Sequence, residues 1–224
     1  MSSVMALLGI ELDEVSAKEK VVSAATGAVA ITLLVLLARW VDADAGGAWL
    51  ISSMGASAVL LFAVPHGQLS QPWPVIAGHV VSALIGVTCA RYISHPALAG
   101  GAAVGLSIGA MHQFKFIHPP GGATALTAVI GGPNIRALGY GFVVHPVLVG
   151  SVAMVLFAVA LNALFPWRRF PAHLARRPPH GPDEPSHRAV VAALRRMDSF
   201  IDVSEEDLVE LYELVREEMS LSGP

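Results

Sequence analysis

The chain has 224 residues, 54% of them hydrophobic and 14% charged, whereas an ordinary soluble domain carries about 25% charged residues. Between Val21 and Pro166 only six side chains are charged, so 25 of the 31 charged residues lie near the two ends. A soluble protein with such a long uncharged stretch would aggregate, and the composition therefore predicts an integral membrane protein. The net charge of −3 comes from the acidic tail and does not indicate a nucleic-acid partner.

Apolar segments predict a polytopic all-α bundle in the lipid bilayer. Residues 1–20 resemble an interfacial helix ahead of the membrane domain, which we place at 21–166. Prolines and polar residues interrupt the apolar segments and mark the connections between helices. In chain order, the predicted membrane segments are Val21–Val41, Gly46–Val64, Val75–Ile93, Ala97–Met111, Pro119–Ile130 and Phe142–Phe165.

The segment Pro119–Ile130 is too short to cross a membrane. Its 12 residues would extend about 18 Å as a helix, against a hydrocarbon core of about 30 Å. Prolines stand at its start and Gly131-Gly132-Pro133 follows its end. These features predict a half-helix.

Two parts of the membrane domain resemble each other. Gly55-Ala56-Ser57-Ala58 matches Gly122-Ala123-Thr124-Ala125, and each is followed by an apolar segment with an early histidine, His79 or His145. The pattern predicts two internal repeats, at about 21–93 and 97–165, each with the order helix, Gly-Ala-Ser/Thr-Ala helix, His helix. Transporters commonly place their substrate where such repeats meet. Six crossings would make the repeats inverted and four crossings with two re-entrant half-helices would make them parallel; we favour six.

The start of the half-helix has the features of an anion site. Proline is tolerated in the first turn of a helix, and the glycines after it leave backbone amides unobstructed at the positive end of the helix dipole. Hydroxyls from equivalent positions of the two repeats would add donors, and upstream cations would add positive potential. The predicted binding residues are His118, Pro119, Pro120, Gly121, Gly122, Ala123, Thr124, Gly55, Ser57 and Lys115.

Three further histidines, His112, His79 and His145, are candidates for proton exchange or gating. The apolar segments contain no Asp or Glu, although cation and proton-coupled transporters usually carry such residues in the membrane. Their absence favours an anion or a neutral solute as substrate. It also argues against a hydrolase triad and against a metal site, so we expect no catalytic residues, no metal and no cofactor.

Residues 167–224 form the expected tail. Ser204-Glu205-Glu206-Asp207 resembles a capping box, and Leu208, Leu211, Tyr212, Val215 and Met219 recur at helical spacing. We expect a short amphipathic helix. The arginines after Pro166 favour the cytoplasmic side, which places both termini in the cytoplasm.

The run Ile117-His118-Pro119-Pro120-Gly121-Gly122-Ala123-Thr124-Ala125 is similar to the signature of the HPP family of integral membrane proteins. Met54–Phe62, Gln71–His79 and Asp198–Glu206 also resemble that family. The resemblance implies four transmembrane segments, and plant and cyanobacterial members are described as nitrite transporters. Some bacterial members carry C-terminal CBS domains; the sequence stops after the short acidic helix, so we do not expect nucleotide regulation through such domains here.

These observations predict a transporter or channel for a small monovalent anion, nitrite first and nitrate second. We expect it to be a homo-oligomer in the inner (plasma) membrane of a bacterium. The alternative is a non-transporting membrane scaffold or sensor subunit that binds a soluble partner through its acidic tail. A wet cavity beside His118 favours transport, and a dry, close-packed Gly-Ala seam favours the scaffold.

Overall fold

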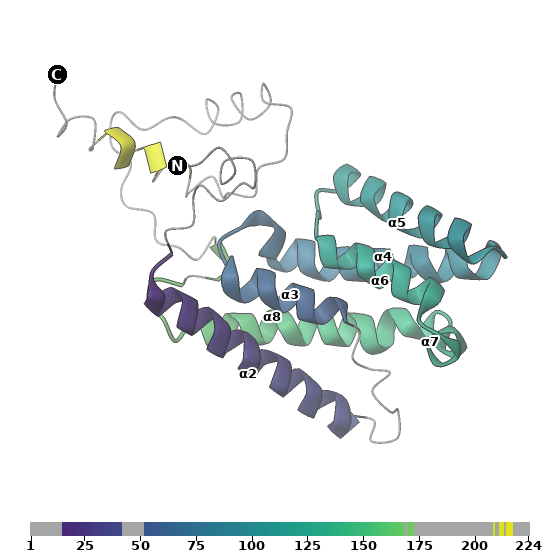
Figure 1. Ribbon diagram of the computed structural model, residues 1–224, viewed down its shortest axis with the longest axis horizontal. Coiled ribbons are helices and arrows are strands. Elements are labelled where there is room, and N and C mark those ends of the chain that lie inside the picture. The colour runs from purple at the N-terminus through teal and green to yellow at the C-terminus, as the bar shows by residue number, and fades with distance from the viewer. Residues whose placement is uncertain are drawn as a thin grey trace, which may run out of the picture.

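The computed structural model describes residues 15–41, 52–168 and 170–172, together with 208, 211, 212 and 214–216 in the tail. Within these residues the fold is all-helical, as predicted (Figure 1). The six described tail residues are helical as well, whereas residues 1–14 of the predicted interfacial helix and Met219 lie outside the described part. The elements are α2 (Ala17–Val41), α3 (Ser53–Ala63), η1 (Gln68–Ser70), α4 (Pro72–Tyr92), α5 (Pro96–Gln113), α6 (Pro119–Ile130), α7 (Pro133–Leu138), η2 (Val143–Leu148) and α8 (Val149–Asn162).

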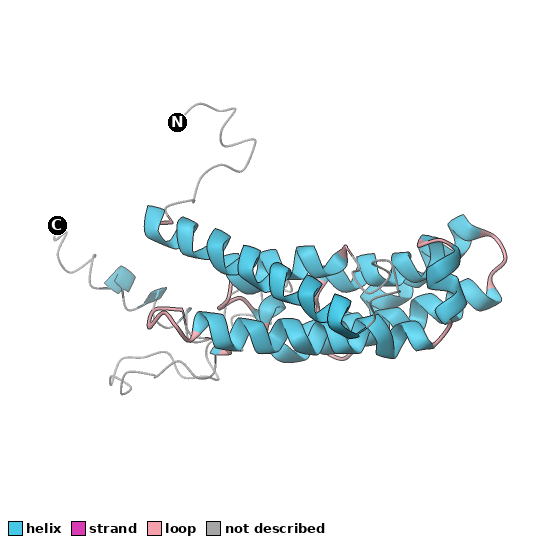
Figure 2. Ribbon diagram, turned by 90° about the horizontal axis from the view of Figure 1, so that it is seen from below, coloured by secondary structure: helices cyan, strands magenta, loops and turns pink. Residues whose placement is uncertain are grey.

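The helices form an elongated bundle (Figure 2). Three helical stretches are long and apolar enough to cross a membrane: Ala17–Val41, Pro72–Tyr92 and Val143–Asn162. Leucines and valines are exposed on the outer faces of the helices, and aromatic side chains lie at helix ends. Tryptophan and tyrosine at such positions suit the two membrane–water interfaces. Among the exposed aromatics, those at or near helix ends include Trp40, Trp73, Tyr92 and Trp167.

Two of the predicted membrane segments form short helices, α3 and α6, and these run in opposite directions. α6 has the predicted bounds, Pro119–Ile130. The predicted span Gly46–Val64 is described only as the 11-residue helix α3, and residues 42–51 lie outside the described part. Successive helices alternate in direction along the bundle (Figure 1). This alternation is what an inverted arrangement requires, while the internal repeat itself stays a prediction.

The predicted membrane segment Phe142–Phe165 corresponds to the candidate span Val143–Asn162, but its helix is kinked near the start. His145 has a non-helical backbone, with φ −122° and ψ 116°, and it interrupts the helix within η2. The cause is Pro146, which lacks an N–H and disfavours a helical residue before it. The sequence analysis also missed α7, which begins at Pro133 between two glycines with positive φ, Gly132 at 92° and Gly139 at 51°.

The centre of the bundle depends on close packing of α4 against α6. A Cβ on Gly121 would lie 2.4 Å from the carbonyl oxygen of Gly78, and a Cβ on Gly86 would lie 2.5 Å from that of Ala125. Neither contact leaves room for a methyl group. Small residues at these positions therefore let the two helix backbones touch, as at many interfaces between membrane helices.

One buried cation ties the end of α3 to α2 and α8. Arg168 is 1% exposed; it donates to Glu19 Oε1 at 2.7 Å and to Asn162 Oδ1 at 3.0 Å, and it also bonds the Phe62 carbonyl. Asn162 donates in turn to the Leu61 carbonyl at 3.2 Å. Burial lowers the pKa of the Arg168 guanidinium and the Glu19 carboxylate raises it, yet arginine stays charged in proteins. The guanidinium thus caps carbonyls at the end of α3 that have no partner within the helix.

These contacts also place the start of α2 and the end of α8 at the same end of the bundle (Figure 1). The membrane domain therefore begins and ends on one side, as an even number of crossings requires.

We predict that Gly121→Ala destabilises the protein, because the added methyl group has no space against Gly78. Overpacking of this kind costs about 1–3 kcal/mol, and it should lower the midpoint of thermal unfolding of the detergent-purified protein. The matched control is Gly122→Ala, since a Cβ there meets nothing within 4 Å. Equal midpoints for the two variants would contradict the tight approach of α4 and α6.

We also predict that Arg168→Gln destabilises the protein. The change leaves Glu19 and the Phe62 carbonyl without the buried cation, and breaking a buried pair costs about 3–5 kcal/mol. The exposed Arg91 provides the control, because Arg91→Gln should alter stability by less than about 0.5 kcal/mol. The same unfolding measurement applies, and a similar small effect of both changes would refute the structural role of Arg168.

Candidate functional site

His118 is positioned by the prolines that follow it. A residue before proline favours extended backbone, and His118 has φ −146° and ψ 96° as the residue that precedes α6. Pro119 and Pro120 then start the helix without loss of hydrogen bonds, because the first N–H groups of a helix have no partner within it. The His118 side chain is fully buried, so the signature sequence places an imidazole inside the bundle at the start of a short helix.

The loop between α3 and α4 offers His118 a fixed partner. The Leu69 carbonyl oxygen lies 2.8 Å from His118 Nδ1. Ser70 Oγ bonds the Leu60 and Val64 carbonyls at 3.0 and 2.7 Å, and Gln71 Nε2 bonds the Gly67 carbonyl at 2.9 Å. Because these bonds hold the loop on the end of α3, the Leu69 carbonyl has little freedom to turn away.

Five side chains from three helices meet beside this loop. We call them the polar cluster; all are 0–1% exposed, and they are Ser53, Ser57, His79, His118 and Thr124. Ser53 and Ser57 are four residues apart on α3 and so share one face of the helix. His79 comes from α4 and Thr124 from α6. The close packing of α4 on α6 brings these residues within reach of α3.

The polar cluster is a continuous chain of short hydrogen bonds. Ser53 Oγ lies 2.8 Å from Thr124 Oγ1, which lies 2.7 Å from His79 Nδ1. On the other side of the ring, His79 Nε2 lies 2.8 Å from Ser57 Oγ, which lies 2.9 Å from His118 Nε2. The two imidazole rings stand edge to face with centroids 4.9 Å apart. Each of these side chains therefore has a partner although it lies deep in an apolar bundle.

With both rings neutral, the Leu69 carbonyl determines the direction of every bond. A carbonyl only accepts, so the proton of His118 lies on Nδ1 and Nε2 accepts from the Ser57 hydroxyl. The Ser57 oxygen then accepts from His79 Nε2–H, which leaves His79 Nδ1 as acceptor of the Thr124 hydroxyl. All donors along the chain point the same way, toward Leu69.

The structure brings some of the predicted site residues together and separates others. Ser57, His79, His118 and Thr124 belong to the polar cluster, and Pro120 and Gly121 are buried next to it. The N–H of Gly121 is not free, because it donates to the His118 carbonyl at 2.8 Å. The remaining predicted residues lie outside the cluster: Gly122 is half-buried, and Gly55, His112, Lys115, Pro119, Ala123 and His145 are exposed.

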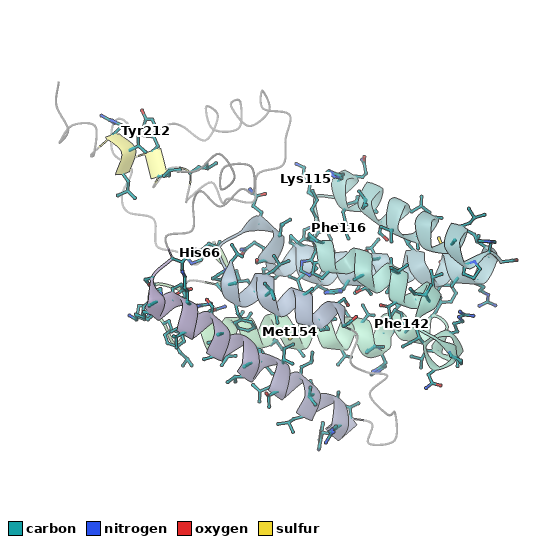
Figure 3. The ribbon with its side chains drawn as sticks, in the orientation of Figure 1. His66, Lys115, Phe116, Phe142, Met154 and Tyr212 are labelled. Carbon is teal, nitrogen blue, oxygen red and sulfur yellow. The ribbon has the colours of Figure 1, made fainter. Side chains whose placement is uncertain are left out.

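Lys115 is one of the predicted site residues that lie outside the polar cluster. It has φ 57° in the connection between α5 and α6, and Figure 3 shows it at the surface while its neighbour Phe116 lies inside. The Lys115 ammonium group therefore lies at the surface near the α5–α6 connection and is not part of the polar cluster.

Ser82 is a polar residue that the sequence analysis did not select. Its hydroxyl is fully buried and has no hydrogen-bond partner in the part of the chain that the structure describes. Ser82 lies one turn after Gly78 and one turn before Gly86 on α4, so all three face α6. The four-residue spacing of the small residues Gly78, Ser82 and Gly86 is the sequence feature that could have identified Ser82. A buried hydroxyl without a partner is unusual in a packed interior.

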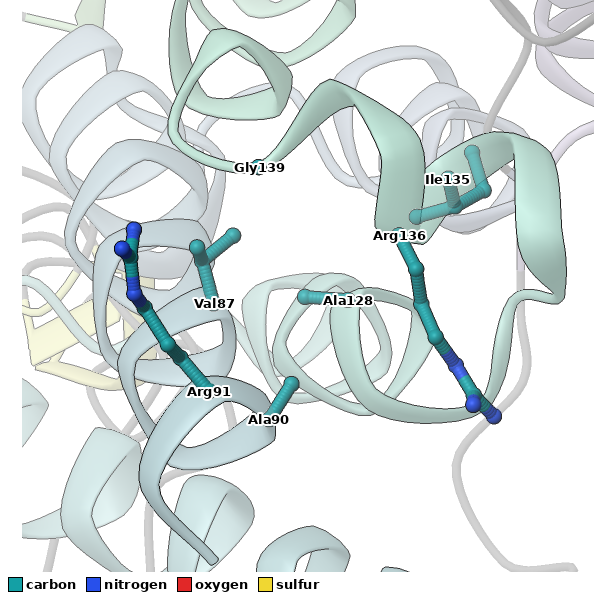
Figure 4. Close-up of a pocket in the computed structure, with 7 residues that line it drawn as sticks. All are labelled: Val87, Ala90, Arg91, Ala128, Ile135, Arg136 and Gly139. Atoms are coloured by element: carbon teal, nitrogen blue, oxygen red, sulfur yellow. The ribbon is translucent and has the colours of Figure 1, made fainter.

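A cavity of about 270 Å³ lies further along α4 and α6, at the end of the bundle that carries α7. Figure 4 shows Arg91 of α4 on one side and Arg136 of α7 on the other, with Val87 and Ala128 between them. Neither arginine pairs with a carboxylate among the described residues. The cavity is therefore lined by two arginines with no carboxylate partner in the described part of the chain, and its other lining residues are mostly apolar.

A comparison with protein-family models assigns the helical domain to one family. Residues 12–171 match the model of the transmembrane region of HPP proteins. The chain belongs to the HPP transmembrane family. The His118-Pro119-Pro120 signature of this HPP protein is thus the turn that carries the buried imidazole into the polar cluster.

Two transmembrane proteins of Dictyostelium discoideum are similar to this HPP chain. One is 37% identical over 147 residues, which cover 64% of this chain and 47% of that protein. The other is 39% identical over 128 residues, or 55% of this chain and 45% of that protein. The chain thus spans less than half the length of these relatives. No solved structure matches it significantly.

We predict the tautomers of the two buried histidines. His118 should carry its proton on Nδ1 and His79 on Nε2, because the Leu69 carbonyl orders the chain. In protein labelled with ¹⁵N-histidine and embedded in lipid, imidazole nitrogen shifts report the tautomer, and His79→Gln and His118→Gln identify the signals. His112→Gln is the control, since the exposed His112 should leave both signals in place. An Nε2–H tautomer at His118 would contradict the assigned order.

Proposed function

We propose that this HPP protein is a transporter or channel for a small monovalent anion, nitrite first and nitrate second. The observation that carries the proposal is the polar cluster, in which five buried polar side chains meet between two short helices. Polar groups inside a membrane are costly and generally mark a substrate or ion pathway. Nitrite as the first candidate comes from the resemblance to plant and cyanobacterial HPP members.

The charges near the pathway favour an anion. The described parts of α3, α4 and α6 contain no carboxylate, and the cluster offers hydroxyl and imidazole donors. At the α7 end of the bundle, Arg91 and Arg136 line the cavity and would concentrate anions. The exposed Lys115 and His112 would do the same near the α5–α6 connection.

The cavity and the cluster lie along the same two helices. Val87 and Ala128 line the cavity, and directly beside them Gly86 touches Ala125. Ser82 and Thr124 follow beyond that contact. We propose that the contact between Gly86 and Ala125 closes the route, and that separation of α4 and α6 admits the anion to the hydroxyls of Ser82 and Thr124.

We further propose that the shared end of α2 and α8 faces the cytoplasm of a bacterium. Lys18 lies 3.5 Å from the centre of the Trp167 ring, and Arg168 is at the same end. Basic residues beside membrane segments favour the cytoplasmic side, and tryptophan favours the interface.

A second candidate is a non-transporting membrane scaffold or sensor subunit. The close contacts at Gly78, Gly86 and Gly121 favour it, because they form a tightly packed seam. In that case the small residues serve packing, including packing between copies of the chain, and the acidic tail binds a soluble partner. The described tail side chains at Leu211, Tyr212 and Val215 are exposed and available for such a contact.

The test of transport is anion flux through the purified chain in proteoliposomes. Nitrite or nitrate uptake should exceed that of protein-free vesicles. His118→Ala and Thr124→Val should abolish it, because each removes a member of the buried chain.

The matched control is Ser107→Ala. Ser107 is also fully buried, but its hydroxyl bonds only the Ala103 carbonyl of its own helix, at 2.7 Å. Size-exclusion profiles establish that each variant is assembled. Wild-type flux in both cluster variants would show that the proposed site is wrong, and no flux of any tested anion in the wild type would favour the scaffold.

A further inference from the structure

We infer that the cavity between the end of α4 and α7 binds the phosphodiester head group of an anionic phospholipid. Two arginines line it, Arg91 of α4 and Arg136 of α7. The other lining residues have no polar side chain, and they are Val87, Ala90, Ala128, Ile135 and Gly139. A phospholipid has the matching composition, because its charged phosphate is joined through glycerol to acyl chains. Binding of this lipid does not depend on the proposed transport function.

The cavity forms because α6 ends early and α7 turns back across its end. α6 has only 12 residues. A Cβ on Gly131 would lie 3.0 Å from Cγ1 of Ile135, so α7 packs directly on the end of α6. Gly139, with φ 51°, then turns the chain away from α7. The Tyr140 hydroxyl lies 3.2 Å from Thr88 Oγ1, which ties the connection after α7 to α4 beside the cavity.

The cavity lies at the level of the phosphate groups in a bilayer. α4 is long and apolar enough to cross a membrane, with the exposed Trp73 near its start and the exposed Tyr92 at its end. Tryptophan and tyrosine prefer the two membrane–water interfaces. The 19 positions between them rise about 28 Å, close to the hydrocarbon thickness of about 30 Å. Arg91 precedes Tyr92 and therefore stands among the head groups.

The two arginines supply the complementary charge. Both are exposed, and Figure 4 shows them on opposite sides of the cavity. Neither has a carboxylate within ion-pair distance in the part of the chain that the structure describes. A guanidinium can bind a phosphate through two parallel hydrogen bonds while its aliphatic stem lies along an apolar wall. The apolar residues between the arginines favour an anion that also carries an apolar part, which a hydrated inorganic ion lacks.

The lipid would also affect the proposed route, and this consequence rests on the proposed function. The cavity is the entrance that we propose for the transported anion. A bound lipid phosphate would compete with that anion for Arg91 and Arg136. Anionic lipid would then restrict entry from the α7 end of the bundle, whereas neutral lipid would leave the entrance open.

The test is lipid binding to the purified full chain, measured by native mass spectrometry. The probe is phosphatidylglycerol, and phosphatidylcholine with the same acyl chains is the zwitterionic comparison. Each nearby arginine contributes about fivefold to the binding of an anionic lipid, so phosphatidylglycerol should be preferred by about tenfold or more. Glycerol 3-phosphate, which has no acyl chains, should not displace it at equal concentration. Equal binding of the two lipids overturns the site, and displacement by glycerol 3-phosphate overturns the assignment to a lipid.

Variants separate the cavity from the general surface charge. Arg91→Gln and Arg136→Gln should each lower the preference for phosphatidylglycerol about fivefold. The matched control is Arg39→Gln, which should leave the preference unchanged, because Arg39 is exposed in the last turn of α2 and does not line the cavity. Ala90→Leu keeps both arginines but fills part of the cavity, so it should lower the preference as well.

Size-exclusion profiles identify any variant that fails to fold. An equal loss in Arg39→Gln and Arg91→Gln would show that surface charge alone attracts the lipid, and this result overturns the site. An unchanged preference in folded Ala90→Leu protein overturns it too, because the lipid would then not enter the cavity.

Anion flux is measured separately, in proteoliposomes of phosphatidylcholine alone, so that the lipid site and the transport function can fail independently. A preference for phosphatidylglycerol in a protein without anion flux supports the lipid site and overturns transport. Anion flux without any lipid preference overturns the lipid site and leaves transport standing.

Discussion

The contact between α4 and α6 at Gly78 and Gly121 leaves no space for a side chain on either residue, and the rest of the site depends on it. His79 is the next residue after Gly78, and His118 precedes Gly121 by three positions, so the backbone contact places the two imidazoles edge to face. Without a water layer or a methyl group between the helices, the rings and the Thr124 hydroxyl lie within hydrogen-bonding distance. Tight backbone packing thus creates the polar chemistry at the centre of the bundle.

α3 joins this pair because its ends are held from outside. Arg168 and Asn162 bond the Phe62 and Leu61 carbonyls, and Ser70 bonds those of Leu60 and Val64. Such caps matter more in a membrane than in water, because lipid offers no alternative partner for a carbonyl at a helix end. The same loop presents the Leu69 carbonyl to His118, so one set of bonds both ends the short helix and orients the buried chain.

Burial and charge are distributed in a consistent way. The outer helix faces carry exposed leucine and valine, the centre carries neutral hydroxyls and imidazoles that satisfy one another, and the cations stand at the ends. A neutral, fully bonded cluster avoids the cost of a buried charge. The unpartnered Ser82 hydroxyl and the two arginines of the cavity are the exceptions, and they lie on the route that we propose for an anion.

The sequence alone determined the features that depend on local chemistry. Apolar runs of membrane length, the prolines that start α6 and the glycines that follow it led to an all-helical membrane domain and to the bounds of α6. The motif also singled out His118 and Thr124, the repeat pattern singled out Ser57, and the structure places all three in one cluster. Family membership could be recognised from the same motif.

Tertiary structure decided what no local pattern encodes. The sequence analysis counted Arg168 among the surface cations of the tail, whereas the fold buries it against three helices. It treated His79 and His145 as equivalent, but His79 is buried in the polar cluster, whereas His145 is exposed and lies where Pro146 interrupts the helix. The partner of His118 is a backbone carbonyl at Leu69, and every residue has such a carbonyl, so residue type gives no signal for it. Contacts between segments that lie far apart in the chain depend on how closely the helices pack, and that distance is a property of the assembled bundle.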